Sequence, residues 1–294
     1  MRSLARPLAS CERIRVHFQF LMANPLIPTS DFNYIEGTEG IDDLTGLNTS
    51  DYIVGKGGND KIRGWNGDDV IEAGDGDDIV SGDNIIEFTT QSDDTIYGER
   101  GNDKLFGRFG DDYLDGGKAN DLLFGGSGSD HLLGGDGNDR LFGGVVSGEE
   151  RYDSGVDAAD VLEGQAGNDK LFGHEGDDFL TGADPSTGGL YEYDQLTGGE
   201  GDDTFVLGDS NRAYFTEGRG GDHAVIRDFE EGDTVQLNGD SSDYLMTYKS
   251  SQGRSFLKYL GNNYDLVAVF NGVDMTQISL DSSTFEYVLM NISR

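Results

Sequence analysis

Apolar residues recur along much of this chain with a period of nine, and an aspartate precedes each one by two places. In GKGGNDKIRGWNGDDVIEAGDGDDIVSG, which begins at Gly55, the first such pair is Asp60 and Ile62 and the last is Asp78 and Val80. An internal repeat of fixed length is typical of a solenoid, in which similar units stack on one another. The repeat therefore governs the prediction of the fold.

Sixteen units share this pattern when each is numbered from its leading position, which is usually glycine. Position 8 is apolar in all of them and position 6 is always aspartate, and these aspartates are Asp42, Asp51, Asp60, Asp69, Asp78, Asp94, Asp103, Asp112, Asp121, Asp130, Asp139, Asp160, Asp169, Asp178, Asp194 and Asp203. The spacing departs from nine only after positions 78, 139 and 178, and the pattern resumes in phase each time. We therefore expect inserted loops at 83–91, 145–157 and 184–191.

The chemistry of one unit predicts a tight turn followed by a short strand. Glycines at positions 1 and 4 suit a turn that visits positive φ. Positions 7 to 9 are extended, and only the position 8 side chain points inward. Two turns and two strands then make one coil, and the coils must stack because no unit can bury its own apolar face.

The unit resembles the GGxGxDxUx nonapeptide of the RTX, or haemolysin-type, calcium-binding proteins. Clear copies are GGDGNDRLF at 134–142, GGSGSDHLL at 125–133 and GGEGDDTFV at 198–206. The resemblance implies an all-β fold, a right-handed parallel β-roll (solenoid) of nonapeptide repeats. It also implies multiple Ca²⁺ ions between successive turns, bound by the position 6 aspartates and by backbone carbonyls.

Physical chemistry also favours calcium at these turns. Units two apart stack, so Asp103 should lie over Asp121 about 4.8 Å away. Two bare carboxylates at that distance repel by about 3–4 kcal/mol at an effective dielectric constant near 20. Calcium takes six to eight oxygen ligands, whereas zinc prefers Cys or His and magnesium a tighter octahedron. The alternative is a solvated acidic surface or metal-free Asx turns.

The sixteen units divide by parity into two edges of the expected roll. The odd units are interrupted only at Asp194, whereas the even units are interrupted at Asp94 and Asp160. We therefore expect a long continuous calcium column along the odd edge and a patchier one along the even edge. Asp51 is the weakest candidate ligand, because its turn (GLNTSD) lacks the second glycine.

Composition limits the classes of partner. The formal net charge of −35 should repel nucleic acid and anionic membranes. A single cysteine, Cys11, excludes an intramolecular disulfide, and no apolar run is long enough for a membrane span. Residues 1–36 are predicted to be an N-terminal extension without a cleaved signal peptide, and Met22 is a candidate true start.

Residues 207–294 follow the 37–206 roll and alternate in β fashion, as in AVIRDFEEGDTVQL. They resemble the β-rich C-terminal module of bacterial RTX proteins. The resemblance implies a cap on the roll and an uncleaved signal for a type I exporter. A cap also follows from the need to cover the open sheet edges of the last coil.

Nothing in the sequence favours an enzyme. HEGDD at 174–178 lacks the second histidine of HExxH, and GGSGS at 125–129 lacks the last glycine of GxSxG. We expect a secreted, extracellular, calcium-binding structural protein that folds on export. One alternative is a calcium-dependent adhesin that binds a cell-surface component or glycan through the inserted loops or the C-terminal module. Another is an accessory or remnant of an RTX enzyme.

Position 9 of four odd units predicts an aromatic ladder on one outer face of the roll. These residues are Phe106, Phe124, Phe142 and Phe172, and stacked coils would place their rings one strand spacing apart. Position 7 of the same strands supplies Lys104, Leu122, Arg140 and Lys170. The ladder either stabilises the roll itself or forms a docking stripe for the C-terminal module, a second roll or a glycan.

Overall fold

The computed structural model describes residues 32–83, 92–144, 158–184, 192–208, 213–214, 223–260, 265–274 and 285–288. Across these ranges the chain is β throughout, apart from one turn of 3-10 helix, η1 (Ser241–Asp243). The three expected loops lie outside the described residues, except for Asp83 and Asp184 at their starts. No helix in the described ranges is long and apolar enough to cross a membrane.

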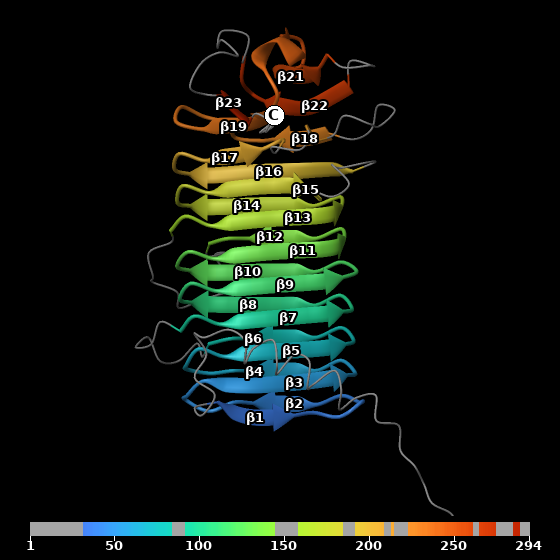
Figure 1. Ribbon diagram of the computed structural model, residues 1–294, viewed down its shortest axis with the longest axis vertical. Coiled ribbons are helices and arrows are strands. Elements are labelled where there is room, and N and C mark those ends of the chain that lie inside the picture. The colour runs from blue at the N-terminus through green and yellow to red at the C-terminus, as the bar shows by residue number, and fades with distance from the viewer. Residues whose placement is uncertain are drawn as a thin grey trace, which may run out of the picture.

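The strands alternate between two long sheets, which we call sheet A and sheet B, and they stack along the long axis of the molecule (Figure 1). Sheet A contains, in spatial order, β1 (Asn33–Glu36), β3 (Asp51–Gly57), β5 (Val70–Asp75), β7 (Thr95–Arg100), β9 (Tyr113–Lys118), β11 (His131–Gly137), β13 (Val161–Gly167), β15 (Phe179–Ala183), β17 (Thr204–Val206), β19 (Thr234–Asn238) and β23 (Phe285–Val288). Sheet B contains β2 (Asp43–Thr45), β4 (Lys61–Arg63), β6 (Ile79–Ser81), β8 (Lys104–Phe109), β10 (Leu122–Ser127), β12 (Arg140–Phe142), β14 (Lys170–Glu175), β16 (Tyr193–Glu200), β18 (His223–Ile226), β22 (Asp265–Asn271), β21 (Arg254–Tyr259) and β20 (Tyr244–Lys249).

Strand pairing confirms the predicted parallel β-roll. Leu123 pairs with Leu105 on one side and Leu141 on the other, so units two apart in sequence are neighbours in the sheet. The register also survives an insertion, because Ile71 pairs with Ile96. From unit 2 onward every position 8 side chain is completely buried, and these side chains fill the core between the two sheets.

The sheets extend beyond the nonapeptide motif at both ends. β1 precedes the first motif, and its Asn33 pairs with Asp51. After the last motif, β18 and β19 extend sheets B and A with parallel pairing, and Asp203 is followed by Asp233 in the ladder described below. β20, β21 and β22 then pair antiparallel at the end of sheet B. The predicted boundary at Val206 therefore marks a change of motif within continuous sheets.

The turns differ from expectation in where they use positive φ. Position 4 adopts it, as predicted, but so does position 2, even where the residue is Lys56 (82°) or Trp65 (86°). Position 1 is glycine for a steric reason. A Cβ on Gly116 would lie 2.6 Å from Oδ2 of Asp121 and 2.7 Å from the carbonyl oxygen of Gly134. The space that a position 1 side chain would need is therefore filled by the aspartate of position 6 and by the next coil.

The aromatic ladder is confirmed on the outer face of sheet B. Rings of successive coils stack with centroids 4.9 Å (Phe106–Phe124), 5.0 Å (Phe124–Phe142) and 4.8 Å (Phe142–Phe172) apart. Nζ of Lys104 lies 4.9 Å from the centroid of the Phe106 ring. Phe106 and Phe124 are only 8% and 4% exposed, and Phe142 and Phe172 are half-buried, so the ladder is not an open apolar stripe. The geometry supports the self-stabilising interpretation.

Replacing Phe124 with alanine should therefore destabilise the calcium-loaded roll by about 2 kcal/mol, because two stacked contacts and a buried ring are lost. Phe179→Ala is the matched control, since that ring lies on sheet A and is 47% exposed. We expect the control to change the free energy of unfolding by less than about 0.5 kcal/mol. Denaturant unfolding in saturating calcium measures both values, and equal losses would contradict a stabilising role for the ladder.

Candidate metal site

The sixteen predicted aspartates form two ladders, one along each edge of the roll. Except at the end of each ladder, Oδ1 of one aspartate and the backbone N–H of the aspartate one coil earlier are joined by a hydrogen bond of 2.7–3.0 Å. The odd ladder contains Asp42, Asp60, Asp78, Asp103, Asp121, Asp139, Asp169 and Asp194. The even ladder contains Asp51, Asp69, Asp94, Asp112, Asp130, Asp160, Asp178 and Asp203.

The two ladders are equally continuous, although we expected the even edge to be patchier. The N–H of Asp69 donates to Asp94 at 2.8 Å across the first insertion, and the N–H of Asp130 donates to Asp160 at 2.7 Å across the second. Each insertion falls between positions 2 and 4 of its unit. Position 6 therefore keeps the same place in the coil as in units without an insertion. Asp51 is fully buried and belongs to its ladder despite its irregular turn.

The second carboxylate oxygen of most ladder residues has no such partner. Oδ2 is buried and accepts no hydrogen bond from the described protein in Asp60, Asp69, Asp78, Asp94, Asp103, Asp112, Asp121, Asp139, Asp169 and Asp194. A buried charged oxygen without a partner is costly and calls for a proton, an unseen water or a cation. These ten residues thus present buried oxygens for which the described part of the chain supplies no donor.

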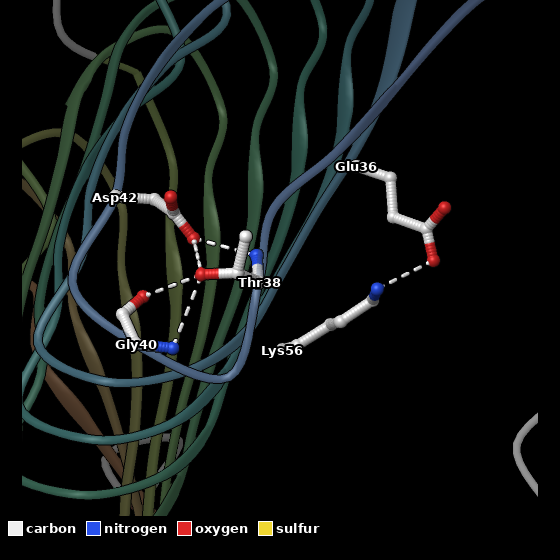
Figure 2. Close-up of polar contacts among 5 residues, drawn as sticks. All are labelled: Glu36, Thr38, Gly40, Asp42 and Lys56. Carbon is white, nitrogen blue, oxygen red and sulfur yellow. Dashed lines mark hydrogen bonds and ion pairs between the residues drawn. The ribbon is translucent and has the colours of Figure 1, made fainter.

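The first turn shows how the chain satisfies this oxygen when it can (Figure 2). Oδ2 of Asp42 accepts hydrogen bonds from the backbone N–H of Thr38 at 2.6 Å and from its hydroxyl at 2.9 Å. The Thr38 hydroxyl also contacts Gly40, while Lys56 and Glu36 form a separate ion pair of 2.7 Å on sheet A. In the second turn Oδ2 of Asp51 accepts the backbone N–H of Leu47 at 2.5 Å, and from unit 3 onward position 2 carries no serine or threonine.

Burial raises the pKa of these carboxyl groups because it penalises their charged form. The pKa rises to about 8 for Asp69 and Asp103 and to about 9 for Asp169, with further raising by neighbouring ladder carboxylates. Burial also raises the pKa of Asp94 and Asp112 well above the ordinary value. Near neutral pH the metal-free ladders therefore hold their negative charge only at a cost in free energy.

Backbone carbonyls of the turns point along the same columns. A Cβ on Gly128 would clash with the carbonyl oxygen of Gly110 one coil earlier and would lie 3.0 Å from Oδ1 of Asp111. A Cβ on Gly126 would likewise meet the carbonyl of Arg108. In the described ranges no three carboxylate, His or Cys side chains form a metal cluster by themselves. A cation between coils would take these carbonyls as ligands beside the ladder carboxylates.

Position 5 forms a second, exposed pair of ladders that we did not predict. On the odd edge it is mainly asparagine, and Oδ1 of Asn120 accepts the N–H of Asn138 at 2.9 Å. On the even edge it is mainly aspartate, and Oδ1 of Asp93 accepts the N–H of Asp111 at 2.9 Å. The even edge consequently carries extra acidic charge beside its buried ladder, which increases its need for cations.

Asp233 is a further ladder residue that the repeat count missed. It is 4% exposed, and its Oδ1 accepts the N–H of Asp203 at 3.0 Å. Its Oδ2 accepts the N–H of Glu230 at 2.8 Å, so this terminal turn is closed by the protein itself. The signal was present in the sequence, since Asp233 precedes the buried Val235 by two places, as in the nonapeptide.

These observations fit calcium. The donor set is made only of oxygens, and it combines buried unsatisfied carboxylates with turn carbonyls in a flexible, repeated arrangement. A divalent cation would remove both the repulsion along each ladder and the cost of the buried oxygens. The fold and its acidic turns thus define the class of calcium-binding β-rolls.

Comparison with protein families gives the same result. The model of the RTX calcium-binding nonapeptide repeat matches residues 29–62, 45–80, 88–123, 115–145, 154–184 and 189–211. These segments together cover more than half of the chain. The chain belongs to the RTX calcium-binding nonapeptide repeat family and is a calcium-binding repeat protein.

No curated protein matches the chain, and the two solved structures described next are similar to it at low sequence identity. The solution structure of the AlgE6R3 subunit of the Azotobacter vinelandii mannuronan C5-epimerase is 23% identical, with a TM-score of 0.28, over 57% of this chain and 78% of that one. The extracellular lipase LipA from Serratia marcescens is 16% identical, with a TM-score of 0.34. That alignment covers 91% of this chain and 41% of the lipase.

Proposed function

We propose that this protein is a secreted structural protein whose roll folds when it meets calcium outside the cell. The sixteen position 6 aspartates and the turn carbonyls hold the ions, several along each edge. The observation that supports this most strongly is the set of ten buried Oδ2 atoms, spread over both ladders, that accept no hydrogen bond from the described residues. Calcium supplies the positive charge that these oxygens require.

The affinity expected of such sites explains why folding follows export. Extracellular calcium modules bind with Kd values of about 10⁻⁴–10⁻³ M. At ten times Kd, one site adds about 1.4 kcal/mol to stability, whereas at submicromolar calcium it adds almost nothing. A chain with many such sites stays unfolded in the cytoplasm, where a type I exporter can thread it, and folds in extracellular calcium. The exporter itself follows from the family resemblance of the C-terminal residues.

The positions of the two motifs weighed as catalytic support a role other than catalysis. Ser127, the serine of GGSGS, is 1% exposed and lies at the end of β10. His174, from HEGDD, sits at a position 2 turn with φ of 91°, and burial lowers its pKa. Neither residue offers an accessible nucleophile or a metal-binding pair.

Fractionation of the cells that make the protein tests the proposal. We expect the intact chain in the medium or at the cell surface, and we expect a chelator to release the surface-bound part and unfold it. Recovery of folded protein from the cytoplasm would contradict secretion. A pull-down from cell surfaces with and without chelator separates the structural role from that of an adhesin. Specific capture of one surface component in calcium would favour the adhesin, whose predicted loops lie outside the described residues.

A further inference from the structure

The outer face of sheet B carries a row of alternating basic and apolar residues. The row runs through position 7 of five consecutive strands, β4 to β12, and we call Lys61, Ile79, Lys104, Leu122 and Arg140 the basic row. Lys61 and Arg140 are exposed, Ile79 is 49% exposed, and the other two are partly exposed. A basic side chain thus recurs every second strand, about 9.6 Å apart.

The outer face of sheet A carries the opposite pattern. Position 9 of β5 to β13 contains Glu72, Tyr97, Asp115, Leu133 and Glu163, which we call the acidic row. All five side chains are partly exposed. Register pairing places them on consecutive strands, so a carboxylate recurs every second strand with an apolar or aromatic residue between.

The insertions hide this periodicity in the sequence. The basic residues are separated by 43 and 36 positions and the carboxylates by 43 and 48, yet each pair lies two strands apart in the sheet. Both rows follow the same strand spacing, and they lie on the two different sheets of one roll. A basic row in register with an acidic row would place base opposite acid and apolar opposite apolar over five coils.

The other charged residues on the outer faces of sheets A and B leave sheet B mainly positive and sheet A mainly negative along these rows. On sheet B, Arg108 and Lys170 add to the positive charge, and Arg63 is paired with Asp43 at 2.7 Å. On sheet A, the cation Lys56 is paired with Glu36 at 2.7 Å, and His131 lies 3.4 Å from Glu163. A positive face is unexpected in a chain with a net charge of −35.

We propose that the basic row of one molecule docks on the acidic row of a second copy of this chain. The charge patterns are complementary, and their common repeat lets several ion pairs form at once. Such a contact is heterologous, because sheet B of one copy meets sheet A of the other. A pair of copies therefore still has one free basic row and one free acidic row. Association therefore extends into a row or sheet of rolls.

This inference rests on the proposed function, because both rows exist only in the folded roll and because bare ladders would make two copies repel. Calcium in the ladders lowers that repulsion without touching the two faces. We expect association only in calcium, and we expect it to weaken as salt is added, since the screening length falls from about 30 Å at 0.01 M to about 8 Å at 0.15 M ionic strength.

Charge reversal and rescue test the contact by sedimentation velocity in calcium at low salt. The wild-type chain should associate as its concentration rises. The double variant Lys104→Glu, Arg140→Glu should associate about tenfold more weakly, and so should Asp115→Lys, Glu163→Lys. Mixing the two variants should restore association, because the unaltered acidic row of the first variant meets the unaltered basic row of the second, and the two reversed rows also complement each other.

Lys249→Glu, Arg254→Glu is the matched control, since both side chains are exposed on β20 and β21, the last two strands of sheet B, beyond both rows. It has the same change in charge and should associate like wild type. Circular dichroism of each sample reports calcium-dependent folding separately. A folded wild type that stays monomeric, or a mixture that fails to associate, overturns the docking proposal. So does binding of an acidic polysaccharide by the basic row of a monomeric protein.

Discussion

In excess EDTA at pH 8 the chain should lose its β structure, and calcium should restore it in a single cooperative transition. At ten times Kd, roughly ten sites would together contribute about 14 kcal/mol. That sum is comparable with the roughly 5–15 kcal/mol that stabilises a whole domain. Titration with calcium, followed by far-ultraviolet circular dichroism, measures the effect. A complete β spectrum in EDTA would contradict calcium-dependent folding.

Protons should replace calcium in part, and the direction of this effect follows from the buried carboxyl groups. Their folded-state pKa values, about 8 for Asp103 and about 9 for Asp169, lie above the value near 4 of an unfolded aspartate. Protonation therefore stabilises the calcium-free roll: this stability is complete below about pH 4, falls as the pH rises, and is lost once the pH has passed through 8 to 9. The chelated chain should show more β structure at pH 5 than at pH 8.

Asp121→Asn should weaken calcium-dependent folding by about 3 kcal/mol, because two calcium positions share this residue. Its N–H donates to Asp139 at 2.8 Å and its Oδ1 accepts from Asp103 at 2.8 Å. The asparagine Oδ1 keeps the latter hydrogen bond, so the variant isolates the loss of the charged ligand. The midpoint of the calcium titration measures the change.

Asp51→Asn is the matched control within the even ladder. Asp51 has one aspartate neighbour, Asp69, while the preceding strand offers Asn33 instead. Only one calcium position involves it, so we expect about half the effect of the central substitution, roughly 1.4 kcal/mol. Equal shifts for the two variants would show that position within a ladder does not decide the contribution of an aspartate.

The nonapeptide made the roll predictable because positions 6 and 8, which recur in every unit, have different structural roles. The aliphatic residue at position 8 fills the core, as Leu123 and Leu141 do, and the aspartate at position 6 marks each turn. The insertions did not obscure the strand register, because each lies within a single turn and the motif resumes in phase after it, as between Asp83 and Ser92. The stacked phenylalanines followed from the same register.

Features that depend on contact between coils were harder to predict. The positive φ of Lys56 at position 2 is one example, because residues as different as Lys56 and Trp65 adopt it and nothing in a single unit marks it. The repeat count did not include the end strands β1 and β18, because Asn33 and Ala224 occupy position 6 there. Asp233 keeps the motif, but we assigned it to the C-terminal segment. The evenness of the two ladders could not be inferred from the insertions alone.

A crystal structure of the chain grown in calcium tests the central claim most directly, through anomalous difference density along the two ladders. We predict a cation between successive aspartates on both edges, such as Asp103 and Asp121 on the odd edge and Asp94 and Asp112 on the even edge. Each cation should be bound by the Oδ2 atoms that now lack a partner and by turn carbonyls. A folded roll whose ladders hold no cation in millimolar calcium would contradict the account.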